Sequence, residues 1–156
     1  MNQAVSGIAS GTRNVGSIIH LAGRAAAGDM QRRATKSSLP WVCLPYEPQM
    51  EFFYAAVDLV VARAGAMTVS ELAATGTPSL LVPLARVGQQ WNAFSLSDVG
   101  GATVVAEGDT GSLPSTIDTL VADERALAAM SRAARSQAFP DAAGVIADRL
   151  IEVANG

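Results

Sequence analysis

The sequence contains few cysteines, histidines and charged residues, and each shortage excludes a class of protein. Cys43 is the single cysteine, so an internal disulfide is impossible and a reducing compartment is favoured. His20 is the single histidine, which leaves too few ligands for a zinc site. Charged residues make up only 16%, and 11 Lys+Arg against 14 Asp+Glu leave no basic excess for nucleic acid.

Long apolar runs and a targeting segment are also missing. No run approaches the roughly 18 residues of a membrane span, and residues 1–13 lack the basic and apolar blocks of a secretory signal. A hydrophobic content of 49% excludes disorder, and 156 residues suit one domain of roughly 100–200. We therefore expect residues 1–156 to form a single soluble, acidic domain of cytosolic type.

Short apolar runs alternate with stretches of helical spacing, which predicts an α/β fold with a parallel sheet flanked by helices. Strands are expected at 16–22, 41–44, 58–62, 79–82 and 102–106. Helices are expected at 2–10, 24–36, 48–57, 67–75 and 89–98, and in two pieces after residue 111, split at Phe139-Pro140. In the last piece Ile146, Leu150 and Val153 form one apolar stripe.

The chain opens on a helix, although doubly wound domains usually open on a strand whose following loop binds phosphate. Two interpretations remain open from the periodicity of residues 2–10. The fold either begins with a helix or lacks its first strand.

The most informative stretch is 58–76, where a buried strand, a loop of small residues and a helix follow one another. Gly65 and Ala66 permit close approach of a ligand, and the first N–H groups of a helix attract anions such as a diphosphate. Thr68 could bind the same group. Glu71, one turn deeper on the same face, could accept hydrogen bonds from the two hydroxyls of a ribose. The combination indicates a nucleotide.

Three of these residues also have structural explanations. Thr68 and Glu71 have the spacing of a capping box, in which both residues only terminate the helix. Arg63 has two possible partners, a bound anion or a carboxylate on the protein surface. The sequence leaves these alternatives open.

Two further loops follow strands and are expected at the same carboxyl edge of the sheet. Gln89, Gln90 and Asn92 present donors and acceptors together, which suits sugar hydroxyls, although glutamine pairs also occur on solvated helices. Tyr46 and Glu47 lie between two prolines in a rigid loop whose backbone could bind a base. Buried structural roles are expected for His20, Cys43, Trp41 and the aromatic cluster 52–54.

Three segments together resemble a known enzyme family. They are 54–71 with the motif Arg-Ala-Gly-Ala-Met-Thr-Val-Ser-Glu at 63–71, Gly76-x-Pro78-x-x-x-Val82-Pro83, and the Gln-Gln-Trp-Asn-Ala run at 89–93. They are similar to the carboxyl-terminal domain of the glycosyltransferase family 28 enzymes that convert lipid I to lipid II in peptidoglycan synthesis. The resemblance covers nearly the whole chain. It implies a Rossmann-like sheet forming the C-terminal, donor-binding half of a GT-B fold.

The resemblance also implies a binding site for UDP-GlcNAc. The start of the helix at 66–68 would contact the diphosphate, Glu71 would hold the ribose, and Gln89 with Gln90 or Gly88 would contact the GlcNAc hydroxyls. The implied binding residues are Tyr46, Glu47, Arg63, Gly65, Ala66, Met67, Thr68, Glu71, Gln89, Gln90 and Asn92. No metal or other cofactor is expected, because the helix dipole takes over the charge role of a divalent cation.

The sequence departs from the family pattern in three places. The loop between Pro83 and Asn92 is shorter, so either glutamine could contact the sugar. Pro48 stands where an acidic residue is common, which affects the uracil loop. The family's Gly-Gly-Ser loop and its preceding strand, expected just before Asn2, are absent. That strand would be central in the sheet, so its loss would leave strand edges unpaired.

The N-terminal domain, which would bind the lipid acceptor and supply the catalytic base, is absent as well. We therefore expect no catalytic residue in this chain and no turnover by the chain alone. A missing N-terminal domain or a partner chain would bind lipid I, on the cytoplasmic face of the plasma membrane. Alternatives are the donor subunit of a two-chain transferase, a silent nucleotide-sugar-binding fragment, and the donor domain of another GT-B enzyme.

Overall fold

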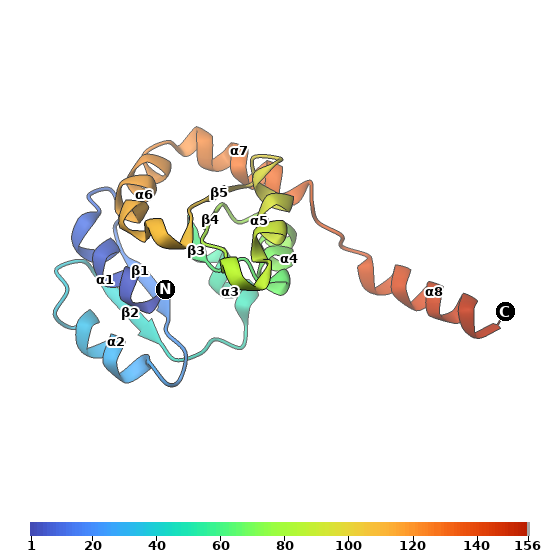
Figure 1. Ribbon diagram of the computed structural model, residues 1–156, viewed down its shortest axis with the longest axis horizontal. Coiled ribbons are helices and arrows are strands. Elements are labelled where there is room, and N and C mark those ends of the chain that lie inside the picture. Colours follow the sequence, from blue (N-terminus) through green and yellow to red (C-terminus); the bar gives the residue numbers. More distant parts are fainter. Residues whose placement is uncertain (156) are drawn as a thin grey trace.

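Five short parallel strands alternate with helices along residues 1–155, the part of the chain described by the computed structural model (Figure 1). The strands are β1 (Ile18–Leu21), β2 (Trp41–Leu44), β3 (Val60–Ala62), β4 (Ser79–Leu81) and β5 (Ala102–Val104). The α-helices are α1 (Asn2–Gly11), α2 (Ala27–Ala34), α3 (Met50–Ala55), α4 (Ala66–Thr75), α5 (Gln89–Ser97), α6 (Leu113–Val121), α7 (Glu124–Arg135) and α8 (Ala142–Asn155). Two 3₁₀ turns are η1 (Ala85–Val87) and η2 (Glu107–Ser112). The predicted α/β class and all five predicted strands are confirmed.

The strands form two sheets rather than the single sheet expected. β1 pairs with β2, and β4 pairs with β3 on one side and β5 on the other. No strand pairing joins the two sheets within residues 1–155, so every strand except β4 has an edge without a strand neighbour. The apolar pattern identified each strand, but it did not predict which strands pair with one another, because pairing depends on tertiary packing.

The core is divided among three clusters of buried side chains. Leu80 and Leu81 of β4, and Val82 directly after it, are 0% exposed, as are Leu72 of α4 and Leu113 of α6. Leu80 packs in a cluster with Ile8 of α1 and Leu113 of α6, whereas Leu81 packs in the cluster that contains Leu72 of α4. Different helices cover the two faces of this sheet, and its strands are mostly apolar on both faces, with Ser79 and Thr103 as the polar exceptions.

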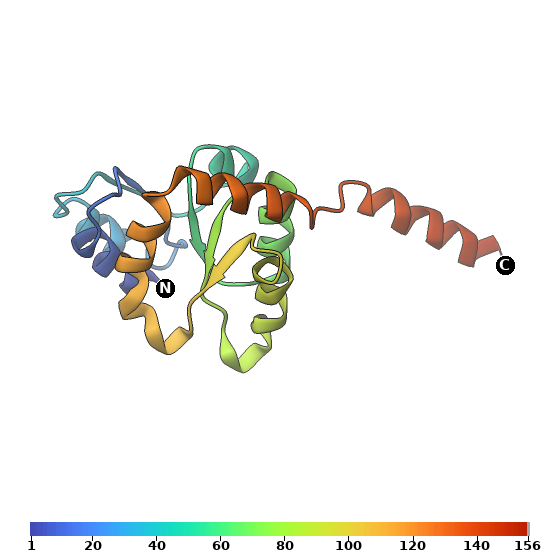
Figure 2. The same ribbon diagram turned by 90° about the horizontal axis from the view of Figure 1, so that it is seen from above.

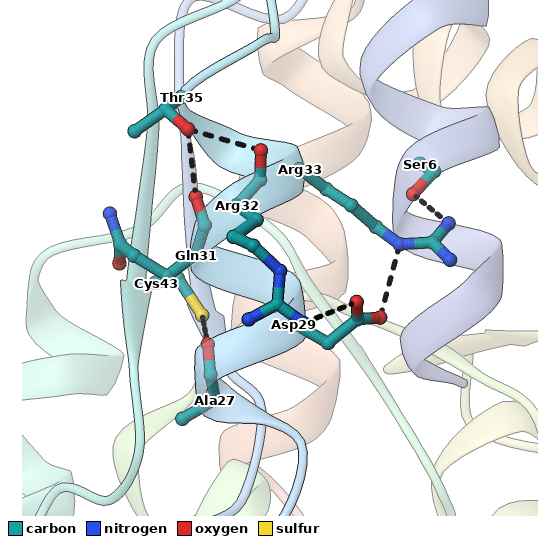
Figure 3. Close-up of polar contacts among 8 residues, drawn as sticks. All are labelled: Ser6, Ala27, Asp29, Gln31, Arg32, Arg33, Thr35 and Cys43. Atoms are coloured by element: carbon teal, nitrogen blue, oxygen red, sulfur yellow. Dashed lines mark hydrogen bonds and ion pairs between the residues drawn. The ribbon is translucent and has the colours of Figure 1, made fainter.

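The smaller sheet packs against α2, and Figure 3 shows the polar contacts there. Cys43 of β2 is buried, as expected, and its thiol lies 3.9 Å from the carbonyl oxygen of Ala27. Arg33 of α2 pairs with Asp29 and donates to the Ser6 hydroxyl of α1 at 3.4 Å. Exposed ion pairs contribute at most about 1 kcal/mol, so apolar packing holds this sheet in place.

Residues 112–155 contain three α-helices, not the two expected. The break between α6 and α7 was missed in the sequence, and the Asp123 carboxylate accepts from the Ala126 N–H at 3.0 Å to start α7. The split at Phe139-Pro140 is confirmed. Beyond it α8 projects away from the rest of the chain (Figures 1 and 2), and none of its described residues is buried. No helix within residues 1–155 is long and apolar enough to cross a membrane.

His20 is buried in β1 and bonded to the first turn of α1. Its Nε2 lies 3.2 Å from Asn2 Oδ1, and Asn2 Nδ2 donates to the Ala22 carbonyl at 2.9 Å. Because the Asn2 amide nitrogen donates there, its oxygen is the acceptor and Nε2 of the neutral imidazole is the donor. Nδ1 has no partner among residues 1–155. Burial lowers the pKa of His20 below its ordinary value of 6.5.

Acid is therefore expected to destabilise the fold through His20. The unfolded chain binds the proton more tightly, so the free energy of unfolding should fall as the pH drops below 6.5 and through the lower folded pKa. Urea unfolding at several pH values measures this slope, and His20→Gln should reduce it. The chain has one histidine, so its NMR titration is unambiguous. A folded-state pKa at or above 6.5 would contradict the prediction.

Candidate functional site

A cavity of about 520 Å³ lies at the carboxyl ends of β1 and β2. It is lined by Leu21, Gly23, Pro45, Tyr46, Glu47, Pro48, Met50, Glu51 and Glu71. Three of the residues predicted for the site, Tyr46, Glu47 and Glu71, therefore meet at one cavity although they come from two distant segments. The loop after β2 and the helix after β3 therefore meet at the carboxyl edge, as parallel strands allow.

The helix after β3 begins earlier than a capping box at Thr68 requires. Gly65 is the N-cap residue of α4, and the first helical bond runs from the Val69 N–H to the Gly65 carbonyl at 2.9 Å. Thr68 lies inside the helix and makes no capping bond, so the capping-box interpretation is wrong. The backbone N–H groups of Ala66 and Met67, together with that of Thr68, precede the first helical bond and have no partner within the helix. They are available to an anion.

Glu71 is held by a residue that sequence reasoning did not assign to the site. The hydroxyl of Tyr54 in α3 donates to Glu71 Oε2 at 2.7 Å. Tyr54 is 5% exposed, which confirms its expected place in the core. Burial, followed by the bond to the Glu71 carboxylate, raises the pKa of Tyr54 well above its ordinary value, so its hydroxyl remains a donor. No local pattern links residues 17 positions apart on two helices.

Arg63 is paired with a carboxylate, one of the two alternatives left open. It donates to Glu107 Oε1 of η2 at 2.8 Å and to the Val82 carbonyl at 3.1 Å. The Arg63 side chain is 28% exposed, so this ion pair is partly shielded from solvent. In this structure Arg63 joins the loop after β3 to the segments after β4 and β5.

The amides of α5 lie outside the lining of the cavity and make contacts of different kinds. Asn92 donates to the Ala64 carbonyl at 3.0 Å, which fixes α5 beside the start of α4. Gln89 accepts from the Leu84 N–H at 3.0 Å and so braces the turn before its own helix. The buried Oε1 of Gln90 has no partner among residues 1–155 and keeps its capacity to accept a hydrogen bond.

The rim of the cavity adds two residues that the sequence did not single out. Arg24 lies over the exposed ring of Tyr46, with 5.5 Å between the guanidinium carbon and the ring centroid. Gly23 has a φ of 78°, a backbone conformation that a residue with a side chain rarely adopts. A glycine directly after a predicted strand was the available signal for this turn. Glu47 Oε1 accepts from the Gln49 N–H at 2.8 Å, which stabilises the same loop.

The polar residues of the site include no cluster suited to a metal. Among residues 1–155, no group of three or more His, Cys, Asp or Glu side chains is placed to hold a metal ion. Positive groups at the carboxyl edge include the helix N–H groups of α4 and the guanidinium groups of Arg24 and Arg63.

Comparisons with known proteins agree on one family. Residues 1–146 match the model of the glycosyltransferase family 28 C-terminal domain. A Mycobacterium tuberculosis (strain ATCC 25618 / H37Rv) protein is 40% identical over 164 residues, covering 100% of this chain and 39% of its own length. Its name is UDP-N-acetylglucosamine--N-acetylmuramyl-(pentapeptide) pyrophosphoryl-undecaprenol N-acetylglucosamine transferase. A Nocardioides sp. protein of the same name is 38% identical, covering 100% of this chain and 44% of its own length.

A solved structure shows the same fold. The crystal structure of Acinetobacter baumannii MurG superposes with a TM-score of 0.82 at 28% sequence identity, covering 96% of this chain and 46% of that chain. The chain thus spans less than half the length of each of these relatives. From its parallel α/β fold, its motif at 63–71 and the match over 1–146, the chain belongs to the glycosyltransferase family 28 C-terminal domain family.

Proposed function

We propose that this chain is the UDP-GlcNAc-binding part of a glycosyltransferase that transfers GlcNAc to lipid I, forming lipid II for peptidoglycan. The observation that carries the proposal is a partly exposed Glu71 carboxylate in a cavity at the carboxyl edge, one turn from the free N–H groups of α4. Family membership and the shared name of the relatives support the choice of UDP-GlcNAc as the donor and a lipid-linked acceptor.

Each part of the donor has a chemically suitable partner. The loop around Tyr46 would contact uracil, and the carboxylate of Glu71 would accept from the ribose hydroxyls. The N–H groups at 66–68 would donate to the diphosphate. The amides of Gln89 and Gln90 would contact the sugar, and the unpartnered Oε1 of Gln90 favours a ligand hydroxyl at that position.

The chemistry of transfer defines what this chain contributes. An acceptor hydroxyl attacks the anomeric carbon of GlcNAc with inversion, the bond to the diphosphate breaks, UDP leaves, and the hydroxyl proton passes to a base. The helix N-terminus of α4 would stabilise the negative charge that develops on the diphosphate. The base and the acceptor site would come from an N-terminal domain or partner chain, and the undecaprenyl acceptor would place the reaction at the cytoplasmic face of the membrane.

Titration calorimetry of this chain with UDP-GlcNAc tests the proposal. We expect binding with a dissociation constant below about 1 mM in the presence of EDTA, because helix N–H groups supply the positive charge. UDP should compete for the site, while free GlcNAc and ADP-glucose should not. Absence of binding at millimolar UDP-GlcNAc by the folded chain would overturn the proposed function.

A further inference from the structure

We propose that Tyr54 is a positioning residue for nucleotide binding: its hydroxyl holds the Glu71 carboxylate in the orientation that accepts the vicinal diol of a ribose. This inference rests on the proposed function, because it assumes that Glu71 faces a nucleotide. It assigns to the buried residue Tyr54 a role in ligand affinity and in the discrimination of ribose from deoxyribose.

The first support is geometric. The Tyr54 hydroxyl and Glu71 Oε2 are 2.7 Å apart, a short bond typical of a hydroxyl that donates to a carboxylate. The two residues lie on different helices, α3 and α4, so the bond orients Glu71 from outside its own helix. The Glu47 carboxylate, which also lines the cavity, is bonded to a backbone N–H of its own loop instead.

The second support is the rigidity of the donor. Tyr54 is 5% exposed and packs in the same cluster as Val69 and Leu72 of α4, on either side of Glu71 in the sequence. Its ring also meets Phe53 edge-on, with centroids 5.9 Å apart. A ring fixed on several sides leaves its hydroxyl little freedom, and the long Glu71 side chain is fixed with it.

The third support is the count of acceptor sites. An ionised carboxylate offers about four lone-pair sites, and Tyr54 occupies one of them on Oε2. Oε1 has no hydrogen-bond partner among residues 1–155 and belongs to a side chain that lines the cavity. Tyr54 thus uses one lone pair of Oε2 and leaves Oε1 and the second lone pair of Oε2 free. The carboxylate can then accept hydrogen bonds from two adjacent hydroxyls.

The test compares two ligands on the wild-type chain and on Tyr54→Phe, which removes the hydroxyl and keeps the ring. Calorimetry is run with UDP and with 2′,3′-dideoxy-UDP, which lacks the diol. We expect Tyr54→Phe to weaken UDP binding by about three- to tenfold and to leave dideoxy-UDP binding unchanged. In a Glu71→Gln background, Tyr54→Phe should no longer change the ratio of the affinities for UDP and dideoxy-UDP, because the carboxylate that Tyr54 positions is absent.

The other possible outcomes would contradict either the role of Tyr54 or the proposed function. Equal weakening of both ligands, or no change in either, would mean that Tyr54 acts only in packing or not at all. Binding of UDP and dideoxy-UDP with equal affinity by the wild type would overturn the inference while leaving nucleotide binding intact. No binding of UDP by the wild type would overturn the proposed function and the inference with it.

A second measurement applies if Tyr54→Phe does not fold. The Tyr54 hydroxyl proton of the wild-type chain should give a slowly exchanging NMR signal, because it is buried and bonded to Glu71. We expect that signal to shift when UDP is added and to shift much less with dideoxy-UDP. Its absence, or equal shifts with both ligands, would overturn the inference.

Discussion

Glu71→Gln is expected to weaken UDP-GlcNAc binding by about 10- to 150-fold, the effect of losing about 1.5–3 kcal/mol of hydrogen bonding to a charged acceptor. The amide retains the shape of the side chain, and its oxygen can still accept from Tyr54. The packing of α3 against α4 should therefore be unchanged. What is lost is the second charged oxygen, which has no partner among residues 1–155. Calorimetry with UDP-GlcNAc measures the change, and the melting temperature without ligand should stay close to that of the wild type.

Glu124→Gln is the matched control for this replacement. Glu124 is the first residue of α7, and it lines a separate cavity of about 460 Å³ with Pro78, which precedes β4. The same chemical change there should leave the affinity for UDP-GlcNAc unaltered. A loss of less than about twofold for Glu71→Gln, or equal losses for both variants, would show that Glu71 has no specific part in binding.

Leu80→Ala is expected to lower the free energy of unfolding by about 2–5 kcal/mol. Leu80 is 0% exposed in the central strand of the larger sheet and packs between α1 and α6. Its truncation removes buried apolar surface and leaves a cavity that neighbouring side chains fill only in part. Domains of this size are stable by only about 5–15 kcal/mol, so the change is a large fraction of the total. Urea unfolding followed by circular dichroism measures it.

Leu150→Ala makes the same change on α8, where the side chain is 66% exposed. The expected effect is within about 0.5 kcal/mol, as for most surface replacements. A comparable loss at both positions would mean that α8 packs against the rest of the chain in solution. That result would contradict the projecting arrangement seen in Figures 1 and 2.

Local signals predicted much of the fold because they act between neighbours in the chain. The helix predicted at 67–75 ends at Thr75, and Gly76 follows it with a φ of 65°, which glycine adopts without steric penalty. The five strands were visible as short apolar runs, and the Phe139-Pro140 break was visible as a proline after a helical pattern. The break between α6 and α7 was not visible, because the apolar spacing continues across it and only the Asp123 cap marks it.

For the candidate site, too, the sequence predicted the local motifs but not the contacts between distant residues. The motif at 63–71 and the loop at Tyr46 were found in the sequence, because a strand followed at once by small residues and a helix is a local pattern. The partners of the side chains were not found. Arg63 had two alternatives that only the position of Glu107 decides, and the capping-box alternative for Glu71 fails only because α4 begins at Ala66.

Composition by itself determined that the chain cannot form an internal disulfide, since it has one cysteine. The absence of a zinc site and of charge-driven nucleic-acid binding stays a prediction from one histidine and no basic excess. Composition and periodicity also determined the α/β class and the edge of the sheet that carries the polar loops. Tertiary structure decided that the strands form two sheets, that Tyr54 holds Glu71 and that α8 stands apart. The physical reason is distance along the chain: backbone preferences act over a few residues, whereas side-chain partners depend on surfaces that only packing brings together.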